Sequence, residues 1–470
     1  MYKLNICLLP LLLLLSFLQR AGAQNVGIGT TIPLARLHVA DSSVLFTGGA
    51  INRNAAPPVS GAGTRMMWFA PSAAFRAGIV TGTHWDLTNI GQASLGIGED
   101  VNASGKGSVA LGYQTLAAGD HSFAAGDRSH ATAIGAFSQG SLAVASGSYS
   151  FALGASVRTT GEYATAIGAA SYASGSFSFA AGAARANGEY SVAIGRSATA
   201  TGDKSYALGE FSRSVGIYSY ALGTGNTAKG YAETVLGANA IESNSSPDSW
   251  VGNDPILQVG NGRDSWSKST AFTILKNGNT GIGSMLPQAK LHIEGNQLIK
   301  LNSSGGTPQL ILEATQSGDG SRIQFRNSNT GNRVWNLYGQ PHLSNDADAR
   351  FHINYSRVGN VMEMRGNGNV WFRGTVTQNS DVNLKKNITV VDNALTKIQQ
   401  LSGYNYYWKD STRDQQLQAG LLAQEIETWM PELVTTDEAG IKSVNYSGLI
   451  PYLVEAIKEQ QKIIEQLRKK

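Results

Sequence analysis

The sequence has almost no cysteine. Its one cysteine, Cys7, lies in an apolar run near the N-terminus. Because we expect that run to be removed on export, the mature chain would hold no thiol, which excludes a disulfide scaffold, a thiolate metal site and a cysteine nucleophile. Charged residues make up only 15% of the chain and hydrophobic residues 42%, a balance that argues against intrinsic disorder. With 12 prolines and no Gly-X-Y period, collagen is excluded as well.

The excess of positive over negative charge is also small. The formal net charge is +4, and no basic block precedes the terminal Arg468-Lys469-Lys470. Binding to nucleic acid by phosphate neutralisation therefore has little support, and we predict no nucleic-acid partner. No pair of carboxylates stands out as a glycosidase site, and no cluster of ligands suggests a metal. The sequence predicts neither a cofactor nor a bound metal.

The N-terminus has the pattern of an export signal. Lys3 is followed by the apolar stretch 8–18 and by Ala21-Gly22-Ala23, a small-x-small cleavage site. The alternative is a membrane anchor, but the run is shorter than the about 20 residues that span a bilayer. We predict a signal peptide at 1–23, a mature chain without a transmembrane segment, and a secreted or cell-surface location.

Glycine, by contrast, is abundant, with 55 residues, and it is periodic. One set recurs at intervals of 14 residues, with a disturbed double unit after Gly126 and a 13-residue step before Gly195. A second set follows seven residues behind. The first set is Gly98, Gly112, Gly126, Gly154, Gly168, Gly182, Gly195, Gly209, Gly223 and Gly237, and the second is Gly105, Gly119, Gly147, Gly161, Gly175, Gly188, Gly202, Gly216 and Gly230. Two glycines per unit indicate two turns, each at a positive φ.

Short strands are expected between these turns. Alanine occupies one side of each strand, as at Ala110, and larger apolar residues such as Val109 and Leu111 occupy the other. Residues 98–237 contain no proline, as strands within a continuous ladder require. Two strands and two turns per unit predict one coil of a β-solenoid. We expect the alanine side to pack against something flat, most simply an identical chain. A flexible Gly/Ser linker is the alternative, but linkers do not keep apolar residues in phase.

The repeat unit resembles a known family. Ser108-Val109-Ala110-Leu111-Gly112 and Ser205-Tyr206-Ala207-Leu208-Gly209 are similar to the head repeats of YadA-type trimeric autotransporter adhesins. That resemblance implies a left-handed parallel β-roll that trimerises and that binds host matrix or other surfaces. The chain differs from the family in lacking amphipathic strands of an outer-membrane anchor at its end.

A second repeat joins distant parts of the chain. The segment Gly27–Pro33, followed by Ala35–Val39, corresponds to Gly281–Pro287, followed by Ala289–Ile293. Each copy predicts a turn and a short strand, with a proline that starts the extended segment. The copies carry His38 and His292 at matching places. We interpret both as structural because no further ligands lie nearby, which a metal site would need.

Between the repeats and the C-terminus, residues 238–379 alternate apolar and polar positions in short runs, as in Ser321–Phe325. The pattern predicts an all-β stalk or sandwich. Trp335, Trp371 and Tyr338 are candidates for exposed carbohydrate platforms or, equally, for core aromatics.

The last 91 residues, 380–470, are richer in charge and in helical patterns. Residues 390–401 have helical spacing. In the segment 449–467, apolar residues recur at intervals of three and four with one polar break at Gln460, which predicts a coiled-coil seam that tolerates a trimer. The alternative is a helix that packs on its own globular domain.

Several separated motifs in this segment resemble the peptidase S74 family, the intramolecular chaperone domain of phage tailspikes and tail fibres. They are Ser380-Asp381-Val382-Asn383-Leu384-Lys385-Lys386-Asn387-Ile388, Gly420-Leu421-Leu422-Ala423-Gln424-Glu425-Ile426, Pro431-Glu432-Leu433-Val434, Lys442-Ser443-Val444-Asn445-Tyr446 and Leu449-Ile450-Pro451. The resemblance implies that Ser380 attacks the Asn379–Ser380 bond and that Lys385 is its base. It departs from the family at Asn383, where many relatives have arginine, which leaves the efficiency of cleavage open.

The implied chemistry needs the two side chains to meet. A serine hydroxyl is a weak nucleophile without a base, and a lysine is a base only in its neutral form, which desolvation favours. An offset of five residues does not align on a helix, so Ser380 and Lys385 would meet through a turn or across subunits. From the local sequence alone, the favoured interpretation of Ser380-Asp381 is a helix N-cap with Lys385 and Lys386 solvated. The resemblance to the family reverses that preference.

Taken together, the sequence predicts a mainly β protein. We expect an N-terminal β module at 24–97, a left-handed parallel β-roll at 98–237, a β stalk at 238–379, and an α+β chaperone domain at 380–470 that ends in a coiled-coil helix. The expected function is that of an exported, homotrimeric, adhesin-like or tail-fibre-like surface protein with a glycan or protein receptor, which cleaves itself once and turns over no external substrate. A tailspike-like polysaccharide-degrading enzyme and a purely structural fibre are the alternatives.

Overall fold

The computed structural model describes residues 25–52, 54–298, 310–315, 320–327, 331, 333–341 and 346–470. They fall into two compact units, 1–298 and 299–470, and each is described by itself. The predicted signal peptide lies outside the described residues.

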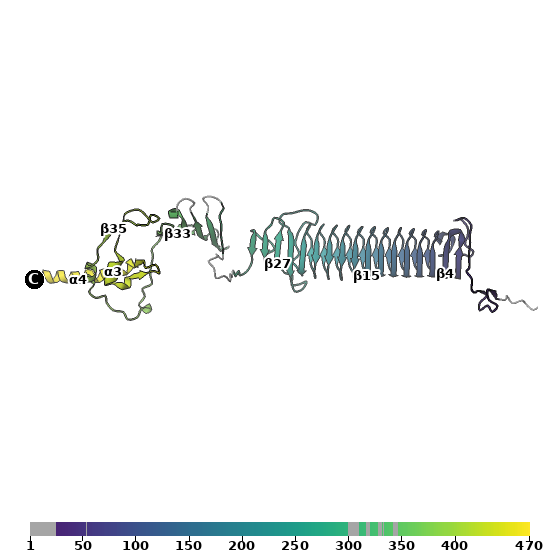
Figure 1. Ribbon diagram of the computed structural model, residues 1–470, viewed down its shortest axis with the longest axis horizontal. Helices are drawn as coiled ribbons and strands as arrows, with labels where there is room; N and C mark the ends of the chain where they lie inside the picture. The colour runs from purple at the N-terminus through teal and green to yellow at the C-terminus, as the bar shows by residue number, and fades with distance from the viewer. Residues whose placement is uncertain are drawn as a thin grey trace, which may run out of the picture. The chain divides into compact units, whose positions relative to one another are not determined.

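The first unit is built around a β-solenoid, as predicted (Figure 1). Each coil adds one strand to a main ladder and one two-residue strand to a second ladder, and every strand pairs in parallel with its equivalent in the neighbouring coil. The main ladder contains β5 (Leu95–Glu99), β7 (Val109–Tyr113), β9 (Phe123–Asp127), β11 (Phe137–Ser141), β13 (Phe151–Ala155), β15 (Thr165–Ala169), β17 (Phe179–Ala181), β19 (Val192–Ile194), β21 (Tyr206–Leu208), β23 (Tyr220–Leu222) and β25 (Thr234–Ala238). The second contains β6 (Asn102–Ala103), β8 (Leu116–Ala117), β10 (His130–Ala131), β12 (Val144–Ala145), β14 (Arg158–Thr159), β16 (Tyr172–Ala173), β18 (Arg185–Ala186), β20 (Thr199–Ala200), β22 (Arg213–Ser214) and β24 (Thr227–Ala228).

The coils stay in register where the sequence looked disturbed. Gly140 pairs with Gly126 and has a φ of 137°, so the first set of glycines continues through this unit without a break. The irregularity is confined to the second set, where Ala133 takes the place of a glycine. The 13-residue step is real, since Phe179 pairs with Val192.

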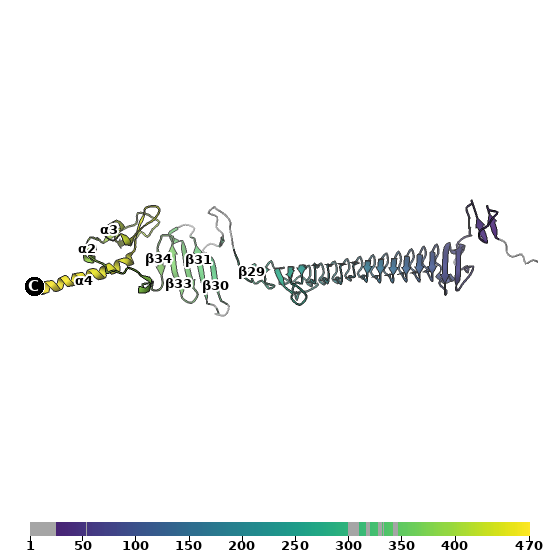
Figure 2. The ribbon, with the colours of Figure 1, turned by 90° about the horizontal axis from the view of Figure 1, so that it is seen from below.

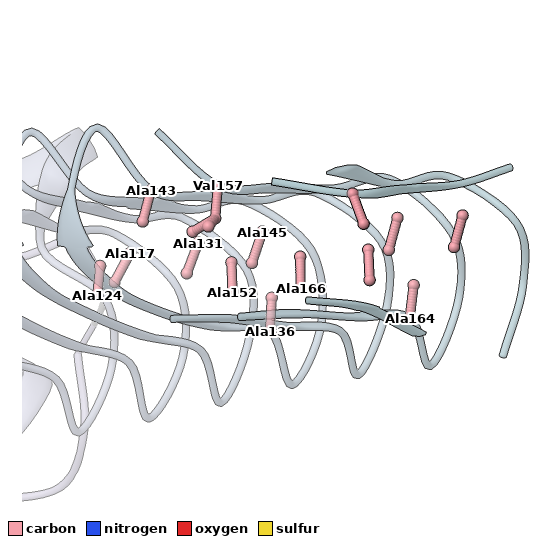
Figure 3. Packing of buried hydrophobic residues seen from close by; sticks show 14 of the residues in the cluster. Ala117, Ala124, Ala131, Ala136, Ala143, Ala145, Ala152, Val157, Ala164 and Ala166 are labelled. Atoms are coloured by element: carbon pink, nitrogen blue, oxygen red, sulfur yellow. The ribbon is translucent and has the colours of Figure 1, made fainter. Parts of the chain in front are cut away.

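The alanines fill the inside of each coil (Figure 3). Ala110 and Ala124 in the main ladder and Ala117 and Ala131 in the second are all 0% exposed. The prediction that the alanine side packs on an identical chain is therefore wrong. The flat surface that each alanine meets is the other ladder of its own coil, and a coil this small has room between its ladders for little more than methyl groups.

The two sets of glycine serve different purposes. The first set has positive φ, as predicted, for example 113° at Gly112. The second does not, and that part of the prediction is wrong: a Cβ on Gly161 would lie 2.1 Å from the carbonyl oxygen of Gly175 in the next coil. Close approach between coils, rather than backbone conformation, therefore requires glycine here. The positive φ of this turn falls two residues later, on residues such as Tyr163 (55°).

The main ladder extends beyond the repeats at its N-terminal end. There β3 (Gly63–Phe69) and β4 (Ala74–Val80) form an antiparallel pair, and β4 pairs in parallel with β5. The fully buried Arg76 closes this end by donating hydrogen bonds to the carbonyl oxygens of Ser94 (3.2 Å) and Ala103 (2.9 Å). Burial lowers the pKa of Arg76 to about 10.

At the C-terminal end, β25 pairs in parallel with β26 (Pro255–Asn261), and β27 (Thr270–Leu275), β28 (Thr280–Ile282) and β29 (Leu291–Ile293) follow in the same sheet. The sheet thus continues past residue 237, where we placed the end of the repeats. In the last coils Glu233 is buried and accepts hydrogen bonds from Gln258 Nε2 (2.6 Å) and from Ser243 Oγ (3.1 Å).

The second sequence repeat forms the same structure twice. β1 (Val26–Ile28) pairs in parallel with β2 (Leu37–Val39) as β28 does with β29, and His38 and His292 lie opposite Gly27 and Gly281. In both copies an asparagine at the start donates to the carbonyl of the proline, over 3.2 Å. Nδ1 of His38 accepts a hydrogen bond from the Leu34 amide, 3.2 Å away.

The second unit contains an antiparallel sheet of β30 (Ser321–Arg326), β31 (Val334–Gln340), β32 (Arg350–Tyr355), β33 (Gly359–Arg365) and β34 (Val370–Phe372), which lie side by side in sequence order (Figure 2). Among the described residues of this unit no second sheet covers it. Trp335 and Trp371 are 44% and 50% exposed and Tyr338 is half-buried, so they do not form a closed core within one chain.

The C-terminal region is α+β, as predicted. Its helices are α2 (Ala394–Gln399), α3 (Ala423–Trp429) and α4 (Leu449–Arg468), and its strands form the hairpins β35 (Tyr404–Tyr406) with β36 (Gln418–Gly420) and β37 (Val434–Thr436) with β38 (Lys442–Val444). Ile426, Met430 and Leu433 form its core with the first turns of α4. The helix expected from residue 390 begins at Ala394, because Asn393 has a positive φ of 50°.

Helix α4 packs on its own domain, which was the alternative interpretation, and it leaves the predicted seam exposed. One face packs on its own domain through Leu449, Tyr452 and Ala456, and the Glu459 carboxylate accepts hydrogen bonds from the first amides of α2, at 3.0 and 2.9 Å. The residues of the predicted seam lie on another face, where Ile457 is 64% exposed and Leu467 is 65% exposed. Within the described part of the chain, no helix has both the length and the apolar composition needed to cross a bilayer.

Candidate functional site

The candidate site is a short turn that follows β34 in the chain. Residues 375–381 have neither helix nor strand, and η5, a single 3-10 turn at Val382–Leu384, comes next. The Asp381 side chain caps this turn by accepting a hydrogen bond from the Asn383 amide over 2.8 Å. The N-cap interpretation is thus correct for Asp381.

The turn brings Ser380 and Lys385 together. Lys385 Nζ donates a hydrogen bond to Ser380 Oγ over 2.6 Å. Of the two routes that the five-residue offset allowed, the structure has the pair meeting through a turn of one chain. The cap and the Ser–Lys contact exist at once, because the cap uses Asp381 and leaves the Ser380 side chain free to reach Lys385.

Both members of the pair are exposed, and so is Asn379 on the amino side of Ser380. Ser380 directly follows the Asn379 carbonyl in the chain, and its side chain is open to solvent. The single chain thus places a serine hydroxyl beside a lysine amino group, and both are open to solvent.

The departure at Asn383 leaves the turn intact. Asn383 contributes its backbone amide to the cap of Asp381, and its side chain is exposed. Since any residue other than proline supplies that amide, the cap of the turn does not depend on asparagine at this position.

A separate hollow in this region was not foreseen. A cavity of about 610 Å³ is lined by Tyr404, Tyr406, Trp408 and Tyr446, and Arg413 lies 4.2 Å from the centre of the Trp408 ring. The alternation of aromatic residues at 404, 406 and 408 is the sequence signal that would have indicated a shared aromatic side. Neither Ser380 nor Lys385 lines this cavity, so it is not a substrate cleft for the Ser–Lys pair.

Metal ligands do not gather at the site. Among the residues that the structure describes, no three His, Cys, Asp or Glu side chains are arranged to hold a metal ion.

Comparison with known families supports both predicted resemblances. Residues 380–435 match the peptidase S74 family, described as the chaperone of endosialidase. Residues 103–129, 131–156, 160–184 and 186–212 match the YadA head domain repeat. These segments coincide with the turn that holds Ser380 and with the solenoid coils.

Two similar proteins are long tail fibre proteins Gp37 of phages. The protein from Salmonella phage S16 is 30% identical over 128 residues, 24% of this chain and 17% of that protein. The protein from Escherichia phage AR1 is 37% identical over 87 residues, 17% of this chain and 8% of that protein. The chain therefore spans less than a fifth of either relative's length in these alignments. Together the matches show a chain that joins YadA head repeats to a C-terminal peptidase S74 chaperone segment and is related to phage tail fibres.

Proposed function

We propose that this protein is a homotrimeric extracellular fibre whose C-terminal segment holds three chains together during assembly and then cleaves its own chain at Asn379–Ser380. The single observation that supports this most directly is the 2.6 Å hydrogen bond between Lys385 Nζ and Ser380 Oγ in a segment that matches the peptidase S74 family. YadA head repeats and relatives among tail fibres support an extracellular, surface-binding fibre. Its receptor would be a glycan or a protein on another surface.

The cleavage proceeds in two balanced steps. Neutral Lys385 takes the proton of Ser380 Oγ as the oxygen attacks the carbonyl carbon of Asn379. The C–N bond breaks, the Ser380 nitrogen takes that proton, and an ester joins Asn379 to Ser380 Oγ. One water molecule then hydrolyses the ester, which gives a carboxylate on Asn379 and a free amino terminus on Ser380.

Assembly would supply the desolvation that the exposed Lys385 side chain lacks in the single chain. Lys385 is exposed in one chain, and burial under neighbouring copies would favour its neutral form. Cleavage would then follow association, so that the chaperone segment is released only from correctly assembled fibres. After release the fibre cannot unfold by reversal of its assembly route, and it persists kinetically.

The test is the intact mass and the N-terminal sequence of the purified protein. Wild-type chain should yield a product that begins Ser380-Asp381. Ser380→Ala and Lys385→Ala should each reduce cleavage at least about 100-fold, because each removes one member of the nucleophile–base pair. Lys386→Ala is the matched control, a neighbouring exposed lysine whose loss should leave the yield of product unchanged.

Cleavage that persists in Ser380→Ala, or an equal loss in Lys386→Ala and Lys385→Ala, would contradict the assignment. Dependence on assembly is tested in the same material: product should appear only in fractions with the mass of an oligomer.

A further inference from the structure

The sheet β30–β34 has one face whose side chains are apolar or aromatic, apart from Ser321 at its edge. Residues opposite each other in an antiparallel pair project to the same side. The register therefore places one continuous row across all five strands, with a shorter row on either side of it. The members are Ile323, Leu337, Ile353, Met362 and Phe372 in the central row, Phe325, Trp335 and Tyr355 in the second, and Phe351, Met364 and Val370 in the third.

The other face is polar and satisfies its own hydrogen bonds. Amides donate from strand to strand, from Gln324 to Asn336 (3.1 Å), from there to Asn354 (3.4 Å), and from there to Asn360 (3.2 Å). Asn360 then donates to Glu363 over 3.0 Å. Beside this ladder the rings of Tyr338 and His352 stack at 4.6 Å. A face so connected is suited to water and needs no partner.

Within the described part of this unit, the apolar face is left uncovered. Phe325 is 55% exposed, Phe351 45% and Phe372 47%. Five strands at about 4.8 Å spacing and about 20 Å of length give this face an area of roughly 500 Å². An apolar patch of this size is comparable to the largest on a typical soluble monomer, about 300–600 Å², and such patches are often interaction sites.

We propose that this apolar face packs against the same face of other copies of the chain and forms a clamp that the fibre keeps after cleavage. The choice of three copies rests on the proposed function. Three faces of roughly 500 Å² bury about 1,500 Å² together, within the range of stable interfaces. No charged side chain belongs to the three rows, so identical faces meet without charge repulsion or a buried unpaired charge.

The position of the sheet in the chain gives the clamp its role. β34 ends at Phe372, on the amino side of the proposed scissile bond. Cleavage would therefore remove α4 and its exposed seam while the sheet stays with the solenoid. The assembly would change from being held by the chaperone segment to being held by β30–β34.

The experiment compares two neighbours on β34 that point to opposite faces. Phe372→Asp places a charge on the apolar face, and Trp371→Asp places it on the polar face at a similar exposure, 50% against 47%. After cleavage, the N-terminal product of wild type and of Trp371→Asp should have, by light scattering, three times the mass of one N-terminal fragment. The product of Phe372→Asp should show a three-fold lower mass.

A second pair of variants separates loss of the clamp from misfolding. Ser380→Ala with Phe372→Asp keeps the chaperone segment, so this uncut chain should stay oligomeric and retain the hydrogen-exchange protection of β30–β34 amides seen in Ser380→Ala alone. An unchanged mass of the cleaved Phe372→Asp product would overturn the clamp. A monomeric wild-type product with a protected sheet would also overturn it and would point instead to cover by the chain's own exposed segment at 310–312.

Failure of the proposed cleavage is distinguishable from failure of the clamp. If wild-type chain is not cut, a protease recognition sequence in place of residues 375–378 releases the same N-terminal fragment from the purified full chain. The mass comparison between Phe372→Asp and Trp371→Asp then tests the clamp alone.

Discussion

The solenoid coils and the sheet β30–β34 are both made of short strands, but they complete their cores in different ways. In a coil, the alanines of two ladders face each other and are fully buried within one chain. In the sheet, the apolar side chains share one face that nothing in the described chain covers. The side-chain volume explains the difference: a methyl group fits between two ladders of one coil, whereas Phe, Trp, Met and Ile need an opposing layer of their own.

This difference changes where association is needed. A coil that fills itself with alanine can stack on its neighbours in the same chain, as solenoid repeats do. The inside of the coils therefore needs no second chain, contrary to our expectation that the alanines pack on an identical chain. Under the proposals made above, association would instead depend on the sheet and on the exposed seam of α4, both of which lie toward the C-terminus of the chain.

The largest expected effect comes from breaking the self-sufficient coil. Gly161→Ala adds a Cβ that would lie 2.1 Å from the Gly175 carbonyl oxygen, a backbone atom that cannot move without opening the ladder. We expect a loss of about 3 kcal/mol or more in the free energy of unfolding. Denaturant unfolding of the full chain, followed by circular dichroism, measures it.

Gly49→Ala is the matched control, since a Cβ there meets nothing within 4 Å and its φ is not positive. It should change stability by less than about 0.5 kcal/mol. Equal stability of the two variants would show that the coils are not packed as tightly as the structure has them.

Much of the fold could be predicted because every repeat unit carries the same local signals. A glycine every 14 residues, alternation between Ala110 and its neighbours, and the absence of proline together favour stacked short strands. The direction of the alanines could not be predicted. Alternation shows that Ala110 and Leu111 lie on opposite sides of a strand, but it does not show which side is inward when both are apolar.

The site was predicted from motifs and not from local physics. Ser380 and Lys385 are five residues apart, an offset that no regular element brings together. Only the 3-10 turn capped by Asp381 makes the contact. The two-faced character of β30–β34 was readable in part, because alternation is visible in Ser321–Phe325. The pairing of rows across five strands needed the register.

A smaller effect is expected at the C-terminal end of the solenoid, where the self-sufficient core contains a carboxyl group. Burial raises the pKa of Glu233, and hydrogen bonds from Gly230, Gln258 and Ser243 oppose that shift. A raised pKa in the folded state contributes stability below the unfolded pKa, and this stability is lost as pH rises through the folded pKa. Lys276, buried nearby, has its pKa lowered by desolvation, which the charges of Asp254 and Glu233 oppose.

Glu233→Gln should therefore gain in melting temperature relative to wild type as the pH is raised from 4 to 8. Glu242→Gln, at an exposed position close by in the sequence, is the control and should follow the wild-type curve. A constant difference between Glu233→Gln and wild type across this range would mean that the carboxyl does not change its charge there.

The smallest expected effect is a gain in the strength of association, and it concerns the exposed seam of α4. Gln460 is the polar break in the seam of α4, whose other members include Ile457 and Ile464. Gln460→Ile should strengthen association of the chaperone segments by about 1 kcal/mol per chain, the contribution of burying an apolar side chain only in part, and it should weaken the selection of one register. Gln461→Ile adds the same side chain one position off the seam and should not strengthen association. The dissociation temperature of the uncut Ser380→Ala chain measures both variants. If they rise equally, added hydrophobicity rather than a seam is responsible, and α4 would use only the face that packs on its own domain.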